Sequence, residues 1–114
     1  CSADSPIPPF AVSPIPSLLG EGWVGEEAVA LALYCFLRYP ESYEKAVIRG
    51  ANTNGDSDSI ACIAGSISGA YIGLGAIPQS WVTRIEKAEY LDGLAQRLAS
   101  KKKEIEHARQ QGDA

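Results

Sequence analysis

Two aspartates and two serines alternate at the start of a long uncharged stretch. Residues 56–59 read Asp-Ser-Asp-Ser, and residues 60–77 carry no charged side chain. Carboxylates one residue apart repel each other unless a cation or hydrogen-bond donors offset their charge. The carboxylate oxygens of Asp56 and Asp58 and the hydroxyl oxygen of Ser59 are hard ligands, which suit magnesium, manganese or calcium and do not suit zinc or copper. The segment predicts a cation site.

The same segment also has the features of a helix start. Asn54 and Gly55 form a turn, and an Asp or Ser directly after a turn can accept hydrogen bonds from the free N–H groups of a helix. One such residue is enough for a cap, so two acids and two hydroxyls exceed that need. An EF-hand is excluded, because the two possible frames place serine where glycine is required, and Ile63 or Gly65 where the bidentate glutamate is required. Capping and cation binding both stay open on these residues alone.

The length, net charge and cysteine content of the chain limit the kinds of partner it can bind and the compartment it suits. The chain has 114 residues and a net charge of -4, which fits one small domain and offers no broad cationic surface for nucleic acid. Its three cysteines, Cys1, Cys35 and Cys62, cannot all pair and lack the spacing of zinc ligands, which favours a reducing, cytoplasmic location. We expect no secretory signal within these residues, and the absence of methionine predicts that they are a segment of something longer.

Helical patterns flank the aspartates on both sides. Residues 26–39 are strong helix formers with acids in the first turn and a proline directly after them, and they are apolar nearly all round. Ser42 is placed to cap a second helix that runs to about Ala51. The uncharged run lacks a strand-like alternation, which predicts a buried helix. Beyond Trp81 the pattern is that of a long amphipathic surface helix, and no strand is expected.

Three further expectations concern the ends and the centre of the chain. Residues 1–19 are rich in proline and are expected to be a linker or a docked arm. The uncharged run is short for a membrane span and rich in glycine and serine, so a membrane helix is not expected. Cys35 and Cys62 lie within apolar patterns, where cysteine usually behaves as a small buried hydrophobic residue.

The segment "GDSDSIACIAGSISGAYIGLGAIPQSW", residues 55–81, resembles the C-terminal metal-binding signature of the ADP-ribosylglycohydrolase family. In that family a glycine, an Asp-Thr-Asp-Thr stretch, a helix rich in alanine and glycine, and Ile-Pro follow in this order. The preceding residues 20–52 are similar to the family's loop and helix pair. Serine stands at Ser57 and Ser59 where the family usually has threonine, which keeps the hydroxyl group.

The resemblance implies an all-α fold, with this chain as its C-terminal part, over residues 20–114. It implies two magnesium or manganese ions in the complete site, with Asp56, Asp58 and Ser59 as metal ligands and Asp58 as a candidate bridge. ADP-ribosyl-[dinitrogen reductase] glycohydrolase-like enzymes belong to the same group. Their substrates carry ADP-ribose on a protein side chain or a small acceptor, and hydrolysis of the glycosidic bond is the implied activity.

The resemblance also implies substrate-binding residues and a missing partner. Gly20 and Gly22 would let the backbone approach the ligand, and Trp23 would lie against a ring or, alternatively, anchor the core. Glu26 and Glu27 are explained by the helix dipole. The family's remaining metal ligands belong to an N-terminal half with no counterpart here, so we expect that half as a second chain or missing segment; no catalytic residue is assigned. The alternative is a non-catalytic helical module that binds ADP-ribose or packs against a partner.

Overall fold

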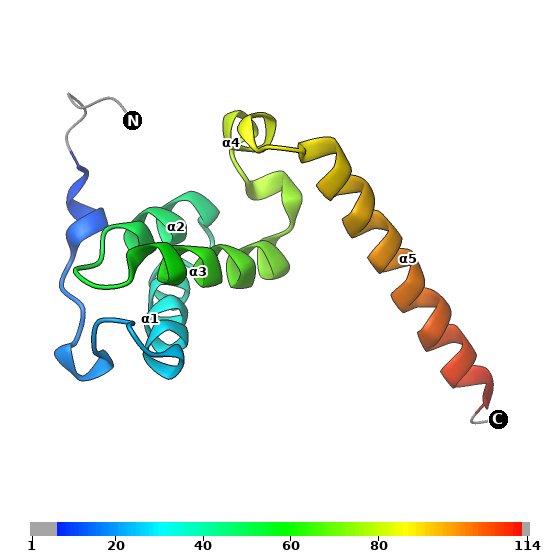
Figure 1. Ribbon diagram of the computed structural model, residues 1–114, viewed down its shortest axis with the longest axis horizontal. Helices are drawn as coiled ribbons and strands as arrows, with labels where there is room; N and C mark the ends of the chain where they lie inside the picture. Colours follow the sequence, from blue (N-terminus) through cyan, green and yellow to red (C-terminus); the bar gives the residue numbers. More distant parts are fainter. Residues whose placement is uncertain (1–6, 113–114) are drawn as a thin grey trace. The chain divides into compact units, whose positions relative to one another are not determined.

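The computed structural model describes residues 7–112, and its contacts divide the chain into two units, Cys1–Pro78 and Gln79–Ala114. The described residues form helices and no strand, which confirms the all-α prediction (Figure 1). The first unit contains the elements η1 (Pro9–Val12), η2 (Ser17–Leu19), α1 (Gly25–Arg38), α2 (Tyr43–Ala51), α3 (Ser57–Ile72) and η3 (Leu74–Ala76). The second unit contains α4 (Gln79–Arg84) and α5 (Ala88–Gly112).

The first helix, α1, lies within one residue of its expected bounds. Glu26 and Glu27 occupy the first turn and Arg38 the last, where their charges oppose the partial charges of the helix ends. One face of the helix is buried: Ala28, Leu31, Ala32, Cys35 and Phe36. The opposite face is not covered by the described residues, although its side chains are also apolar.

The second helix, α2, begins as the sequence predicts. The backbone N–H of Lys45 donates to the Ser42 hydroxyl oxygen at 3.2 Å, so Ser42 is the N-terminal cap. The helix ends at Ala51, and its last turn carries the buried Arg49. The loop that precedes the two aspartates follows directly after the end of α2.

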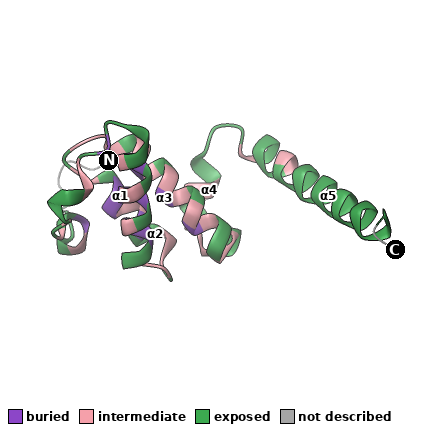
Figure 2. Ribbon diagram, turned by 90° about the horizontal axis from the view of Figure 1, so that it is seen from below, coloured by how far each residue is buried: buried purple, intermediate pink, exposed green. Residues whose placement is uncertain are grey.

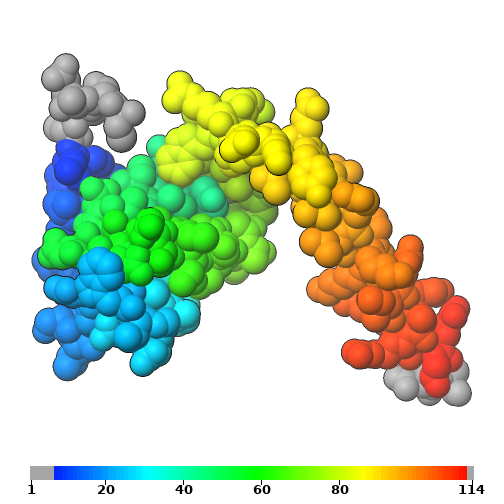
Figure 3. Space-filling view, in the orientation of Figure 1, coloured from blue at the N-terminus to red at the C-terminus, as the bar shows by residue number. Residues whose placement is uncertain are grey.

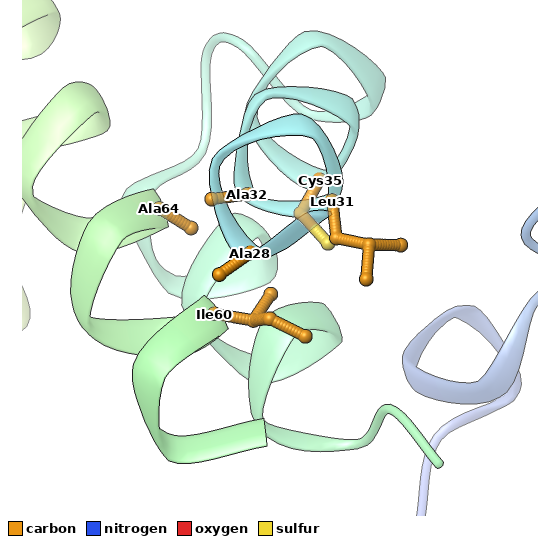
Figure 4. Close-up of a cluster of buried hydrophobic side chains, with 6 residues drawn as sticks. All are labelled: Ala28, Leu31, Ala32, Cys35, Ile60 and Ala64. Atoms are coloured by element: carbon orange, nitrogen blue, oxygen red, sulfur yellow. The ribbon is translucent and has the colours of Figure 1, made fainter. Parts of the chain in front are cut away.

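The core of the first unit lies where α1 meets α3. Ile60 and Ala64 of α3 point toward the buried face of α1 (Figure 4). The side chain of Ile60 has no solvent exposure and stands two residues after Asp58. The burial of Ile60 therefore fixes the first turn of α3, and with it the position of both aspartates.

The buried-helix prediction for residues 60–77 is wrong in part. Helix α3 buries Ile60, Ala64 and Ser68, while the side chain of Cys62 is exposed. Because successive residues turn by about 100° around a helix axis, Cys62 points away from the face that carries Ile60. The expectation that Cys62 is buried is therefore also wrong, whereas Cys35 is buried as expected.

The proline-rich segment is a docked arm over its described part. The guanidinium of Arg49 donates to the carbonyl oxygens of Ala11, at 2.9 Å, and Ser13. The ring of Phe10 packs edge to face on Tyr39, with centroids 5.6 Å apart. The proline-rich backbone has few N–H donors, so its carbonyl groups carry most of these attachments.

The second unit is described by itself. Helix α5 is a long helix without a buried residue (Figure 2), as the amphipathic pattern beyond Trp81 predicts. None of the helices within residues 7–112 combines the length and the apolar character that a bilayer crossing requires.

Candidate metal centre

The two aspartates lie at the start of α3 in different roles. Asp56 is the N-terminal cap residue by position, but its carboxylate accepts no capping hydrogen bond. Its backbone N–H donates to the carbonyl oxygen of Glu21 at 2.9 Å. The Asp56 carboxylate therefore does not cap the helix.

The second aspartate takes part of the capping role. The Ser59 backbone N–H donates to Asp58 Oδ1 at 2.9 Å, so Asp58 satisfies one of the free donors of the first turn. The Asp58 side chain is exposed and that of Ser59 is partly exposed. The capping interpretation thus holds for Asp58 and fails for Asp56.

The two carboxyl groups interact with each other. A hydrogen bond shared with the Asp56 carboxyl group lowers the pKa of Asp58 below its ordinary value of 3.8, and the bond from the Ser59 N–H acts in the same direction. Slight desolvation opposes this shift. The carboxyl groups of Asp56 and Asp58 therefore lie within hydrogen-bonding reach of each other.

A second loop, residues 20–23, packs against the loop of the aspartates. Gly20 and Gly22 have φ angles of 76° and 87°, which favour glycine. A Cβ atom on Gly22 would lie 2.7 Å from Cδ1 of Ile60, and one on Gly55 would clash with the carbonyl group of Glu21. The two loops are thus in direct backbone contact where Gly55 meets Glu21, whereas Gly22 packs on the side chain of Ile60.

The predicted substrate-binding residues lie on this second loop. The backbone N–H of Gly22 donates to Glu27 Oε2 at 3.3 Å, so Glu27 holds the loop in addition to its favourable position in the first turn of α1. The indole N–H of Trp23 donates to Glu21 Oε2 at 3.2 Å. Trp23 is 68% exposed, so it does not anchor the core that the described residues form.

A pocket of about 470 Å³ adjoins both loops. Its walls are the arm, residues 12–17, the start of the glycine loop at Gly20 and Glu21, and residues 52–55. Arg49 and Leu31 complete the lining. The arm therefore contributes one wall of a cavity beside the aspartates.

Arg49 has a role that sequence reasoning missed. Besides the arm, its Nη1 donates to the carbonyl oxygen of Asn52 at 3.1 Å, so one buried side chain ties the arm to the root of the aspartate loop. The pattern of α2 contains an arginine in the last turn, where the helix dipole favours a cation. That signal predicts its charge but not its burial. Glu21 was missed as well, because its main contact is made by a backbone carbonyl group.

The donor set fits part of a magnesium or manganese site. Two carboxylates and a hydroxyl group supply oxygen ligands, which those ions prefer. Among residues 7–112, no third acidic, histidine or cysteine side chain joins Asp56 and Asp58 to form a group able to hold a metal. The described residues therefore fit such an ion as a partial ligand set.

Comparison with known proteins shows to which family the chain belongs. The family model described as ADP-ribosylglycohydrolase matches residues 2–108. The chain belongs to the ADP-ribosylglycohydrolase family. The resemblance found in residues 20–81 is thereby confirmed, and the match extends through the arm and most of α5. No solved structure gives a significant match to the chain.

Individual relatives agree with the family assignment. The chain is 41% identical to ADP-ribosylhydrolase ARH3 of Mus musculus over an alignment of 92 residues, and the alignment covers 72% of this chain and 25% of that protein. The human ARH3 protein is 40% identical over the same shares. ADP-ribosylarginine hydrolase Tri1 of Pseudomonas putida is 29% identical over 65 residues, covering 57% of this chain and 18% of that protein. The chain spans about a quarter of the length of the ARH3 relatives.

Proposed function

We propose that this chain is the metal-bearing part of an ADP-ribosylglycohydrolase-type enzyme, which hydrolyses the glycosidic bond between ADP-ribose and a protein side chain or small acceptor. The observation that carries the proposal is the contact of the two loops. The bond from the Asp56 N–H to the Glu21 carbonyl oxygen, at 2.9 Å, sets Asp56, whose carboxylate does not cap the helix, beside the glycine loop. A candidate cation ligand therefore lies next to a candidate substrate-binding loop.

The chain's own residues have distinct tasks in this proposal. Asp56 and Asp58 would bind magnesium or manganese, two ions in the complete site, with Ser59 as a hydroxyl ligand and Asp58 as the candidate bridge. Bound ions of this kind neutralise charge, orient hydroxyl groups of a sugar and activate water. The buried Ile60 keeps the first turn of α3 rigid, so that the carboxylates hold their positions.

The glycine loop is assigned to the ADP-ribosyl group. Gly20 and Gly22 give this loop its positive φ angles, and the space left by their missing side chains is occupied by Glu27 and Ile60. Trp23 exposes an aromatic ring that is oriented by its bond to Glu21, and an exposed ring suits stacking on a flat group. No residue of this chain is assigned as the catalytic acid or base.

The proposal includes a partner. Two carboxylates are fewer than a bimetal site needs, and the ARH3 relatives are about four times as long as the matched region. The remaining ligands would come from an N-terminal half, supplied as a second chain or as a missing segment. The relatives named ADP-ribosylhydrolase and ADP-ribosylarginine hydrolase support an ADP-ribosylated substrate.

The alternative is a non-catalytic helical module that binds ADP-ribose or packs against a partner. The small number of acids in the described site favours it. In that case the Asp56 carboxylate has no metal to bind, and replacing it leaves the module's binding unchanged.

Metal titration separates the two functions. We expect the chain to bind Mn²⁺ weakly in calorimetry or electron paramagnetic resonance, and the Asp56→Ala, Asp58→Ala double variant to lose that binding. The matched control is Glu89→Ala with Asp92→Ala, two acids three residues apart on α5. Equal Mn²⁺ binding by both double variants would contradict a metal site at the start of α3.

Hydrolysis is then assayed with the chain completed by the remainder of an ARH3 relative. An ADP-ribosylated peptide and free ADP-ribose distinguish cleavage from binding. Release of ADP-ribose that depends on Mg²⁺ and on Asp56 supports the enzyme. Binding of ADP-ribose without release, unaffected by the double variant, supports the module.

We also propose a cellular compartment for the protein, the exclusion of nucleic acid as a partner, and a division of the chain into two parts. A cytoplasmic location is supported by the unpaired thiols of Cys35 and Cys62, since free thiols persist in reducing compartments. The net charge of -4 supports the part of the proposal that excludes nucleic acid as a partner. The division into an arm, residues 1–19, and a C-terminal segment, residues 20–114, stays a prediction.

A further inference from the structure

The guanidinium of Arg49 is buried and bonds to main-chain carbonyl oxygens. Arg49 is 4% exposed, and neither of the ion pairs found within residues 7–112 includes it. Burial of a charge is costly unless hydrogen bonds replace the lost water. The carbonyl oxygens of Ala11, Ser13 and Asn52 supply these bonds. The charge of Arg49 is therefore compensated by the two segments to which these carbonyl groups belong.

A single nitrogen atom of Arg49 links these two segments. They are the described arm, residues 7–19, and the aspartate loop, residues 52–56. Nη1 donates to the carbonyl oxygen of Ala11 at 2.9 Å and to that of Asn52 at 3.1 Å, and it carries one hydrogen atom for each bond. Because the guanidinium is planar and rigid, the two carbonyl groups keep a fixed mutual position as long as both bonds exist.

The aspartate loop is anchored through its backbone at both ends. At its start, the carbonyl oxygen of Asn52 accepts the bond from Arg49. At its end, the N–H of Asp56 donates to the carbonyl oxygen of Glu21 at 2.9 Å. Between these points the hydroxyl group of Thr53 is buried without a hydrogen-bond partner in the part of the chain that the structure describes. The bond to Arg49 is therefore an anchor that the Thr53 side chain does not replace.

The arm is held by side chains of α1 and α2. The Tyr34 hydroxyl donates to the carbonyl oxygen of Pro14 at 3.2 Å, and the ring centroid of Phe10 lies 5.5 Å from Nζ of Lys45. Figure 3 shows the arm, in blue, beside green residues of the same unit. The arm and the aspartate loop line one pocket, and the hydrogen bonds of Arg49 reach both. Arg49 is thus placed to pass a change in one to the other.

We propose that Arg49 is the positioning residue of the candidate metal centre, and that it couples the docking of the arm to the conformation of the aspartate loop. With the arm docked, Nη1 holds Asn52 where the loop also meets Glu21, and Asp56 stands at the start of α3. With the arm detached, the guanidinium loses two of its three partners to water, and the start of the loop loses its fixed position. The consequence for metal binding rests on the proposed function.

The experiment compares three variants of the full 114-residue chain with the wild type. Arg49→Met removes the donors and keeps a long side chain. The arm variant, Phe10→Ala with Tyr34→Phe, removes a ring contact and a hydrogen bond of the arm and leaves α2 and the aspartate loop unchanged. Arg38→Met is the matched control, because Arg38 is an exposed arginine in the last turn of α1.

Amide hydrogen exchange followed by nuclear magnetic resonance is the first measurement, and it needs no metal. The N–H of Asp56 reports the contact with Glu21, and the N–H of Ala64, inside α3, reports the stability of the helices. In Arg49→Met and in the arm variant, we expect exchange at Asp56 to accelerate at least about tenfold more than exchange at Ala64. Arg38→Met should leave the ratio of the two rates unchanged.

The affinity for Mn²⁺, measured by electron paramagnetic resonance, is the second measurement. Its direction separates positioning from charge, because the loss of a cationic side chain by itself strengthens the binding of a cation. We expect the opposite: Arg49→Met should bind Mn²⁺ at least about fivefold more weakly than the wild type. The arm variant keeps the charge of Arg49 and should also bind Mn²⁺ more weakly.

Three results would overturn the inference. The first is an Asp56 N–H that exchanges in the wild type as fast as in an unfolded chain. The second is an unchanged ratio of exchange rates in the arm variant, which decides the question even if Arg49→Met does not fold. The third is tighter binding of Mn²⁺ by Arg49→Met, which leaves Arg49 with an electrostatic effect alone.

The failure of the proposed function gives a different pattern. In that case neither the wild type nor any variant binds Mn²⁺, while exchange at Asp56 still accelerates in Arg49→Met and in the arm variant. Arg49 then positions the aspartate loop, and the loop holds no metal.

Discussion

Helices α1 and α5 both carry apolar side chains, but they are stabilised in different ways. α1 has five buried residues, and its inner face packs on α3 around Ile60. α5 has none, and its side chains bond to each other along the helix, as in the ion pairs from Lys101 to Glu104 and from Lys102 to Glu106. The comparison shows that tertiary packing holds α1, whereas local interactions and helix propensity hold α5.

The sharpest test of this comparison removes one apolar side chain from each unit. Ile60→Ala should lower the free energy of unfolding by about 2–5 kcal/mol, because it leaves a cavity at a fully buried site. Leu98→Ala, at a side chain that is 64% exposed, should change it by less than about 0.5 kcal/mol. Urea denaturation followed by circular dichroism measures both. Similar losses for the two variants would show that α5 is packed as firmly as the core.

Glycine replacements sharpen the same contrast. Gly55→Ala should destabilise the first unit by about 1–3 kcal/mol, because its Cβ would clash with the Glu21 carbonyl group and force the two loops apart. Gly93→Ala in α5 should stabilise by about 0.5–1 kcal/mol, since its Cβ meets no atom within 4 Å. Thermal unfolding compares the two. Stabilisation by Gly55→Ala would refute the close contact of the loops.

The exposed ion pairs along α5 predict a smaller effect on helix stability when one of them is removed. Lys102→Ala should reduce helicity slightly, with a loss of about 0.2–0.5 kcal/mol that disappears at high salt, because it removes the exposed ion pair to Glu106. Lys103→Ala is the control, since no ion pair of Lys103 is found among residues 7–112. The signal at 222 nm in low and high salt is the measurement. A salt-independent loss would indicate packing instead of charge pairing.

The smallest effect concerns the buried thiol of α1. Burial raises the pKa of Cys35 above its ordinary value of 9.0, and the charge of Arg49 opposes this shift in part. The folded state thus keeps the proton to higher pH than the unfolded state, so the free energy of unfolding should fall as the pH rises above 9.0. Cys35→Ala should remove the thiol's contribution to this fall of the free energy of unfolding with pH. Identical pH dependence of wild type and variant would place the thiol in contact with water.

Much of the fold could be predicted from the sequence. The start of α2 at Ser42, the helix content and the position of the aspartates at a helix start depend on neighbouring residues, so local patterns reveal them. The contact between Glu21 and Asp56 could not be predicted, because it joins segments 35 residues apart through backbone atoms that no residue type signals. The exposure of Cys62 was missed because a short chain can leave one side of an apolar helix uncovered.

The sequence by itself determined the family, the all-α fold and the presence of carboxyl and hydroxyl groups at the start of α3, since these follow from residue types and their spacing. Only the tertiary structure decided which of the two aspartates accepts a helix N–H, that Trp23 lies at the surface, and that Arg49 joins the arm to the aspartate loop. The physical reason is that a side chain's partners depend on long-range packing. Local sequence sets which groups are available, and packing sets which of them meet.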